Sequence, residues 1–302
     1  MTRRLVSYLR VAYRPAFYVP FMLLWAIGLT ALFTIVTGAV HQWRPDRGVV
    51  ITALTLVLDM LLLRALDDLG DHGYDRVHNP GRPLPSGLVR ERDLQWLVAV
   101  LAATVLVLNA GRGAALVMLA VQLGYTAVVT AVDRLWGFPP HDRLLLHMAV
   151  NMPIQPLLSL YVYAGFLQNT HQHVSVQGLS AVLAVTLGAM CLEFGRKVTR
   201  QPRPGERTYV TQLGTAGTSG VALTCAVVGV SAVLAVLRPW HPAADAYGWG
   251  WLAVLPLALP SVAFARFAAG ARRWPVAPTL GYVPAMYLSF IAISWLTVQA
   301  PV

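Results

Sequence analysis

Charge is scarce in this sequence of 302 residues. Charged residues make up 12% of the chain and hydrophobic residues 57%, and the mean hydropathy is +0.59. So apolar a chain is typical of a polytopic membrane protein. Cysteine is rare as well, and Cys191 and Cys225 both lie in apolar runs, which argues against a disulfide framework.

The amino terminus lacks the features of a removable signal peptide. The segment MTRRLVSYLRVAYR carries four arginines, and no small-residue cleavage site follows a short apolar core. We therefore expect the first apolar helix to be retained and the amino terminus to be cytoplasmic.

Nine apolar stretches are long enough to be membrane helices. They lie near residues 16–38, 48–66, 94–110, 113–132, 144–166, 177–195, 217–238, 249–269 and 279–298. We expect a single all-α domain over residues 1–302, in which about nine transmembrane helices surround a central cavity. Pro153 and Pro156 predict a kink in the fifth helix.

Basic residues fall mainly on one side of this nine-helix arrangement. Of the 23 lysines and arginines, 19 lie on the side of the amino terminus, as the positive-inside rule predicts for cytoplasmic loops. The loops 67–93 and 196–216 lie on this side, and we expect them to form a polar site there. The lipid bilayer is the expected partner of the apolar surface. Nucleic acid is not expected as a partner, because the basic residues are divided among short loops.

Four of the 13 acidic residues occur together, directly after the second apolar stretch. Asp67, Asp71 and Asp75 recur every four residues and Asp68 lies seven before Asp75, so a continuing helix places the four carboxylates on one side. Like charges at this spacing repel one another unless a cation lies among them. Carboxylate oxygens are ligands that Mg²⁺ prefers, often together with substrate phosphates, and we therefore expect an Mg²⁺ site.

A second polar segment follows the sixth apolar stretch and is mainly basic. Glu193 lies one helical turn before Lys197, the only lysine of the chain, and Arg196 lies one turn before Arg200. Arginine offers two parallel hydrogen bonds to phosphate oxygens, so the segment favours a substrate with several negative charges. An ordinary positive-inside anchor is the alternative.

Together the two segments favour a lipid-like diphosphate as the substrate, with its head between the polar loops and its tail among the helices. Cations that stabilise the departing diphosphate allow the allylic carbon–oxygen bond to break to a carbocation, which aromatic faces then stabilise. The candidate aromatic residues are Tyr125, Tyr161, Tyr163 and Tyr209, for each of which plain packing is the alternative.

The acidic segment resembles the first motif of the UbiA superfamily of intramembrane prenyltransferases. That motif, N-D-x-x-D-x-x-x-D followed by R-P-x-P-x-G, corresponds here to DDLGDHGYD and RPLPSG. The resemblance implies a nine-helix bundle that binds a prenyl diphosphate and Mg²⁺. The metal ligands that it implies are Asp68, Asp71 and Asp75, with Asp67 in place of the usual Asn, and Arg82 is the diphosphate ligand.

The second motif departs from the family pattern. Where most members carry a second pair of aspartates, this chain has E-x-G-R-K from Glu193 to Lys197. Together with R-x-x-D-D-x-x-D-x-x-x-D from Arg64 to Asp75, this segment resembles a divergent branch of the superfamily, the UbiA-type terpene cyclases. We expect catalytic roles for Asp68, Asp71, Glu193 and Lys197. We expect Asp67, Asp68, Asp71 and Asp75 to bind the metal, and Arg64, Arg82, Arg196, Lys197, Arg200 and Tyr209 to bind the diphosphate.

Three functions remain open at this point. A terpene cyclase closes the prenyl cation on its own double bonds, whereas a prenyltransferase passes it to an aromatic or quinone-type acceptor. The expected cavity residues Asn151, Gln155, Tyr125 and Tyr161 suit either enzyme. A non-catalytic carrier is the third function, with buried ionisable residues along a pathway. Asp59 is expected to pair with Arg64 or to support the metal site.

Overall fold

The computed structural model describes residues 2–39, 46–140 and 142–299. Within these ranges all regular elements are helical, apart from one isolated bridge between Thr199 and Arg273. The elements are α1 (Thr2–Tyr8), η1 (Leu9–Tyr13), α2 (Pro15–Val36), α3 (Arg47–Gly70), α4 (His72–His78), α5 (Glu91–Leu108), α6 (Gly113–Trp136), α7 (Leu144–Asn151), α8 (Ile154–Thr170), α9 (Val176–Gly195), α10 (Val210–Leu237), η2 (Trp249–Leu257), α11 (Ala258–Ala268) and α12 (Val276–Gln299).

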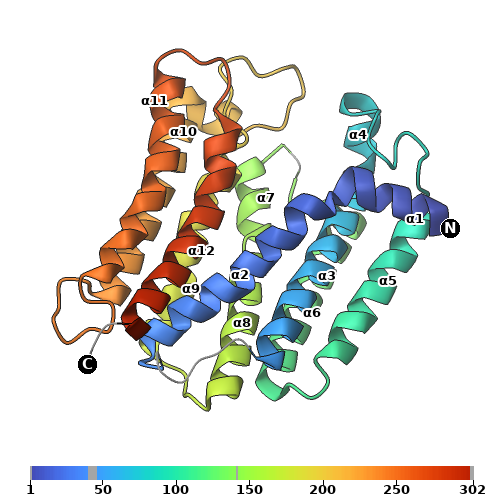
Figure 1. Cartoon of the computed structure of the whole chain (residues 1–302). Helices are drawn as coiled ribbons and strands as arrows, with labels where there is room; N and C mark the ends of the chain where they lie inside the picture. The colour runs from blue at the N-terminus through green and yellow to red at the C-terminus, as the bar shows by residue number, and fades with distance from the viewer. Residues whose placement is uncertain (1, 40–45, 141, 300–302) are drawn as a thin grey trace.

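Eight helical segments in the described ranges are long and apolar enough to cross a membrane. They are α2, α3, α6, α7 with α8, α9, α10, η2 with α11, and α12. The ninth stretch expected from the sequence is α5, whose apolar part is shorter because it begins with Glu91, Arg92 and Asp93. It packs along α3 like a further member of the bundle (Figure 1). The prediction of an all-α polytopic bundle is confirmed.

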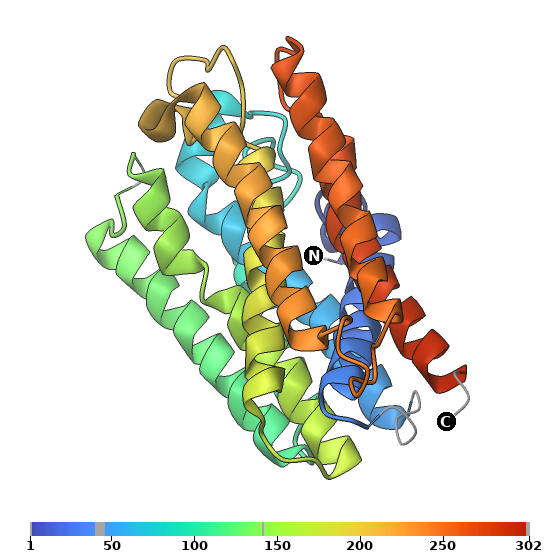
Figure 2. The same cartoon turned by 90° about the vertical axis from the view of Figure 1, so that its left-hand side faces the viewer.

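Most helices stand roughly parallel, and α2 runs obliquely between α12 and α3 (Figure 1). It packs against α3, α8, α9 and α12. Figure 2 shows α6 and α12 at opposite sides of the bundle, with α9 and α10 between them. In Figure 1, α1 lies at one end of the bundle and α12 ends at the other, as an odd number of crossings requires.

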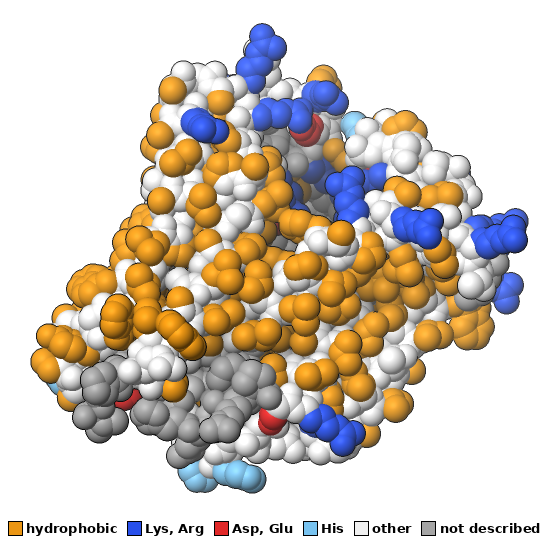
Figure 3. All heavy atoms as spheres, viewed as in Figure 1, with side chains coloured by type: hydrophobic (Ala, Val, Ile, Leu, Met, Phe, Trp, Pro, Cys, Tyr) orange, Lys and Arg blue, Asp and Glu red, His pale blue; other side chains and the backbone are white. Residues whose placement is uncertain are grey.

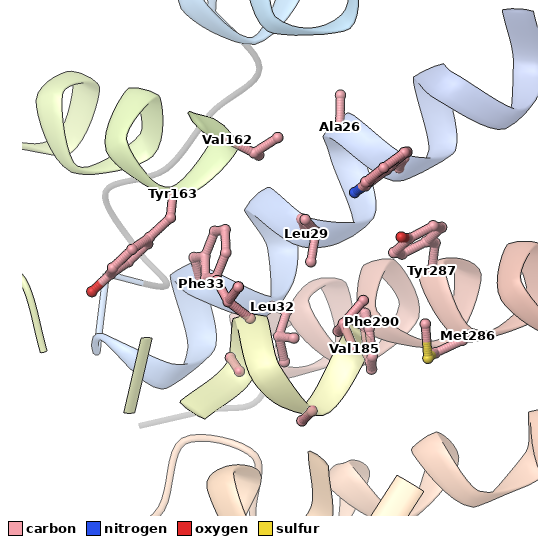
Figure 4. Close-up of a cluster of buried hydrophobic side chains, with 14 of the residues drawn as sticks. Ala26, Leu29, Leu32, Phe33, Val162, Tyr163, Val185, Met286, Tyr287 and Phe290 are labelled. Carbon is pink, nitrogen blue, oxygen red and sulfur yellow. The ribbon is translucent and has the colours of Figure 1, made fainter. Parts of the chain in front are cut away.

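The core forms where α2 meets α8, α9 and α12, and its side chains include Leu29, Phe33, Val185 and Phe290 (Figure 4). A close helix crossing makes this contact possible. A Cβ atom on Gly28 of α2 would lie only 2.5 Å from Cβ of Tyr287 on α12. The two backbones therefore approach each other more closely than any larger residue at position 28 permits.

A break between α7 and α8 lies at Met152 and Pro153, where the sequence predicts a kink. Pro153 has no N–H to continue the helical ladder, so the chain changes direction there. The kink brings Asn151, at the end of α7, and Gln155, at the start of α8, to the wall of one cavity.

Hydrophobic side chains cover the middle of the molecule, as a lipid-facing surface requires (Figure 3). Arginine and lysine side chains gather at the upper end in this view, around a hollow. This is the end at which α4 and the loop before α10 lie (Figure 1).

Candidate active site at the charged end of the bundle

A cavity of about 770 Å³ joins the charged end of the bundle to its interior. Charged side chains of α3, α4, α9 and the loop before α10 line its outer part, among them Asp67, Asp71, Glu193 and Lys197. Apolar and aromatic side chains line the rest, including Phe21, Trp25, Leu158, Ala189, Val283 and Tyr287. One cavity thus presents both a charged region and an apolar region.

The acidic wall is built by the continuous passage of α3 into α4. The N–H of Asp71 donates to the carbonyl of Asp67, and the N–H of Asp75 donates to that of Asp71, both at 2.8 Å. The helical spacing is therefore kept across the junction, although the two helices are separate elements. It brings the four carboxylates to neighbouring turns, as the sequence predicts.

Asp68 is held from two sides and is only 3% exposed. Its Oδ1 accepts a hydrogen bond from Arg64 Nη2 at 2.8 Å, and its Oδ2 accepts one from the Tyr8 hydroxyl at 2.8 Å. Tyr8 ends α1, sixty residues earlier in the chain. Burial, followed by the nearby charge of Asp68, raises the pKa of Tyr8, so this hydroxyl keeps its proton and remains a donor.

Asp75 and Asp71 are paired with arginines. Asp75 is buried, and it accepts from Arg82 Nη1 at 2.7 Å and from Asn79 Nδ2 at 2.8 Å. Arg82 Nη1 also lies 4.0 Å from Asp71 Oδ2, while Asp71 Oδ1 accepts from Arg207 Nη1 at 2.6 Å. Arginines from two different loops therefore reach the acidic wall.

Asp67 differs from the other three carboxylates. It lines the cavity and is exposed to it, and it forms no hydrogen bond or ion pair within 4.0 Å with any residue that the structure describes. A carboxylate that faces a cavity without a partner is free to accept a cation or a donor from a ligand.

The opposite wall is centred on Glu193, near the end of α9. Its carboxylate forms ion pairs with Arg196 (2.5 Å) and Lys197 (2.8 Å) and accepts a hydrogen bond from the Tyr209 hydroxyl (2.7 Å). The Lys197 ammonium also lies 4.8 Å from the centre of the Tyr209 ring. Burial, followed by the charge of Glu193, raises the pKa of Tyr209, so its hydroxyl remains a donor. Glu193 thereby fixes the positions of two cations at the cavity wall.

The residues fit Mg²⁺ by the chemistry of their donors. Among the described side chains, no group of three or more His, Cys, Asp or Glu residues already has an arrangement that holds a metal. Arginines pair with Asp68, Asp71 and Asp75. The open carboxylate of Asp67 lines the same cavity as Asp71, and both supply the hard oxygen ligands that Mg²⁺ prefers.

The cavity brings together most of the residues predicted for the site. Those in its lining are Arg64, Asp67, Asp71, Asp75, Arg82, Asn151, Gln155, Glu193, Arg196, Lys197 and Tyr209. Asp68 lies behind this lining. It contacts the site through Arg64 and through Arg82, whose Nη1 is 3.8 Å from Asp68 Oδ1.

Arg200 and Tyr125 lie elsewhere, which corrects the prediction for both. Arg200 donates to the backbone carbonyls of Phe267 (2.6 Å) and Ala271 (3.1 Å). It therefore joins the loop after α9 to the end of α11 and to the turn that follows, and it lies outside the cavity lining. Tyr125 donates to the carbonyl of Val150 at 2.7 Å, so its hydroxyl joins α6 to α7.

Tyr161 is also displaced from its predicted position in the cavity. It is fully buried, donates to Asn109 Oδ1 at 2.9 Å and accepts from Arg112 Nη1 at 2.9 Å. Arg112 in turn donates to Thr52 Oγ1 at 3.0 Å. This network joins α3, α8 and the α5–α6 turn, because each of these buried polar groups needs a partner.

Asp59 does not pair with Arg64. Its nearest hydrogen-bond partner is Gln122 Nε2 on α6, at 3.5 Å, and both Asp59 and Gln122 are fully buried. Arg64 instead donates to Asp68, which lies one helical turn from it. Arg64 and Asp68 are four residues apart and therefore lie on the same face of α3, whereas Asp59 and Arg64 are five residues apart and do not.

Several residues of the cavity lining were not predicted from the sequence. Tyr74 lies one turn after Asp71, and that spacing was a usable signal. Trp25 and Tyr287 line the apolar part of the cavity. The sequence offers no comparable signal for them, because each is one aromatic residue within a long apolar helix.

The fold is similar to that of solved membrane-protein structures. The apo structure of a UbiA homologue from Aeropyrum pernix K1 matches with a TM-score of 0.60 and 16% identity, over 89% of this chain and 97% of its own. A structure of digeranylgeranylglyceryl phosphate synthase matches with a TM-score of 0.53 and 16% identity, over 98% of this chain and 97% of its own. No protein-family model matches the chain, and no curated protein matches it significantly. The chain therefore has a UbiA-type fold, as its first acidic motif implies.

Proposed function

We propose that this protein is an integral-membrane enzyme that ionises a prenyl diphosphate with the help of Mg²⁺. The observation that carries the proposal is the two-part cavity, in which acidic and basic walls at the mouth continue into an apolar, aromatic interior. A prenyl diphosphate has the matching structure, with a polyanionic head and a long apolar tail. The UbiA-type fold of the chain supports the same substrate class.

The acidic wall is the proposed metal site. Asp67, Asp71 and Asp75 lie in the cavity lining, and Asp68 completes the acidic group behind them. When bound, Mg²⁺ would neutralise charge on the departing diphosphate. Tyr8 and Arg64 hold Asp68 in one orientation, and Arg82 does the same for Asp75.

The basic wall is the proposed diphosphate site. Arg196 and Lys197 line the cavity, and both are fixed by Glu193. Cations positioned in advance stabilise a leaving group without reorganising during the reaction. Glu193 thus acts as a positioning residue, and its loss would free both cations at once.

The apolar part of the cavity is the proposed site of the prenyl tail and of the allylic cation. Phe21, Trp25 and Tyr287 contribute aromatic side chains there, and the face of an aromatic ring attracts a cation. These residues take the role that the sequence assigned to Tyr125 and Tyr161. Apolar side chains around the allylic cation offer it no nucleophile, which favours closure of the cation on its own double bonds. A terpene cyclase is therefore our first assignment.

A prenyltransferase is the second candidate, and a specific observation favours it. Asn151 and Gln155 lie on either side of the α7–α8 kink and line the cavity. Asn151 donates to the carbonyl of His147 at 2.8 Å. The remaining amide groups are placed to bind a polar acceptor. An acceptor held at this wall would share the cavity with the prenyl cation.

Product analysis separates the two candidates. Purified protein is incubated with Mg²⁺ and prenyl diphosphates of increasing length, without and then with an aromatic acceptor. A cyclic hydrocarbon or alcohol formed without acceptor identifies a cyclase, and a product formed only with acceptor identifies a transferase. The Gln155→Leu variant is the matched control, because it should lose transfer but retain cyclisation. No diphosphate release under either condition contradicts the proposal.

A further inference from the structure

One arginine joins the two walls of the cavity across its mouth. Arg207, in the loop before α10, donates from Nη1 to Asp71 Oδ1 at 2.6 Å. Its guanidinium carbon lies 4.2 Å from the centre of the Tyr74 ring, and its backbone N–H donates to the Tyr74 hydroxyl at 3.4 Å. Arg207, Asp71 and Tyr74 all line the cavity. Arg207 thus connects the basic loop to the acidic wall.

Contacts around Arg207 keep the loop in place independently of the ion pair. Tyr74 stacks on His78, with ring centres 4.3 Å apart. Gly205 lies against the same histidine, so a Cβ there would be only 2.9 Å from His78 Cε1. Gly205 has φ of +74°, a conformation that favours glycine. The side chain of Arg207 can therefore change its partner while the loop remains on α4.

The ion pair with Asp71 is suited to exchange. The side chains of Asp71 and Arg207 are 37% and 25% exposed, and a solvent-accessible pair of this kind contributes at most about a fivefold factor to an equilibrium. A phosphate group offers a guanidinium stronger, two-pronged hydrogen bonding. Arg207 also occupies Asp71 Oδ1, one of the two carboxylate oxygens that Asp71 can offer to a metal ion.

We propose that Arg207 and the metal ion compete for Asp71, and that arrival of the diphosphate draws the Arg207 guanidinium from Asp71 to the phosphate oxygens. The inference rests on the proposed function. In the substrate-free protein Arg207 neutralises Asp71 and weakens metal binding. In the loaded protein the same side chain binds the diphosphate and leaves Asp71 to the metal. The stack on Tyr74 holds the guanidinium at the mouth in both states.

In the Arg207→Gln variant, we predict that the affinity for the metal rises and that the affinity for the diphosphate falls. Without substrate, Mn²⁺, which serves as a spectroscopic probe for Mg²⁺, should bind the variant about three- to fivefold more tightly than the wild type, because Arg207 no longer competes for Asp71 Oδ1. A non-hydrolysable prenyl thiodiphosphate should bind at least about tenfold more weakly, because a charged hydrogen-bond donor is lost. A purely structural clamp would weaken both.

The measurement is Mn²⁺ binding by electron paramagnetic resonance, followed by titration with the thiodiphosphate. Arg76→Gln is the matched control, because Arg76 is an exposed arginine of α4 outside the cavity lining and its loss changes the net charge equally. This control should change neither affinity. The chromatographic profile in detergent shows whether each variant is folded, and Arg207→Lys, which keeps the charge but loses the planar fork, provides a second test.

A double-mutant cycle isolates the contact itself. If Arg207 acts through Asp71, Arg207→Gln should leave the Mn²⁺ affinity of the Asp71→Asn protein unchanged. Tighter binding that persists in the Asp71→Asn background, unchanged or weaker binding in Arg207→Gln alone, or no Mn²⁺ binding by the wild type would each overturn the proposal. None of these measurements requires turnover. Failure of the proposed function, seen as absent product, therefore remains distinguishable from failure of the competition.

Discussion

The hydrogen bond from Tyr8 to Asp68 is the contact whose removal tests the site most selectively. Tyr8→Phe deletes one hydroxyl and leaves the ring, which is fully buried. Asp68 Oδ2 then loses its donor at 2.8 Å, while Oδ1 keeps Arg64. A hydrogen bond to a charged group is worth about 1.5–3 kcal/mol. If Asp68 takes part in catalysis, a loss of this size corresponds to roughly a 10- to 150-fold fall in kcat/KM.

Tyr13→Phe provides a matched comparison for this change. Tyr13 is also buried in the amino-terminal segment, and its hydroxyl donates to the backbone carbonyl of Val57 at 2.7 Å. Its deletion should lower stability by about 0.5–1.5 kcal/mol and leave diphosphate release unchanged. The assay is the initial rate of diphosphate release over a range of Mg²⁺ concentrations, with thermal unfolding measured in the same detergent. Equal rates in Tyr8→Phe and Tyr13→Phe would refute the positioning role of Tyr8.

Four further substitutions have defined outcomes. Asp68→Ala and Asp71→Ala should each lower diphosphate release by about 10²-fold or more while the protein remains folded, and full activity in both would exclude the metal-site assignment. Arg112→Leu should destabilise the protein by about 3 kcal/mol in thermal unfolding, because its buried acceptors lose their donor; Mn²⁺ affinity should not change, and a large change would place Arg112 in the site. Gly28→Ala should cost about 1–3 kcal/mol, because its Cβ would meet Tyr287 at 2.5 Å. Gly124→Ala, in α6 with nothing within 4 Å of the new Cβ, should be neutral or stabilising, and equal effects would refute the packing argument.

Hydropathy was enough to predict the bundle, because each membrane helix needs its own apolar length. All nine expected stretches coincide with helical segments, even where Pro153 interrupts one of them. The acidic wall could also be predicted, since Asp67, Asp71 and Asp75 are close in sequence and helical geometry fixes their spacing. Contacts between residues one helical turn apart can be predicted without knowing how the helices pack.

The remainder of the site depends on contacts between distant segments. Tyr8 reaches Asp68 across sixty residues, and Arg207 reaches Asp71 across 136. No sequence period connects such pairs. The aromatic lining was misassigned for a related reason, because helical spacing does not indicate which face of an apolar helix meets the cavity. Tyr161 instead satisfies Arg112 in the core, and this partner could not be identified before the helices were placed side by side.

The central claim is that the two-part cavity binds and ionises a prenyl diphosphate. The most direct test is release of inorganic diphosphate from prenyl diphosphates by the purified wild-type protein, with Mg²⁺ and with EDTA, compared with the Lys197→Gln variant. We predict release that requires Mg²⁺ and falls strongly when Lys197 is neutralised, because Lys197 is one of the two cations that Glu193 holds at the cavity wall. Absence of release at every chain length, or release that is equal with EDTA and in the variant, would contradict the account.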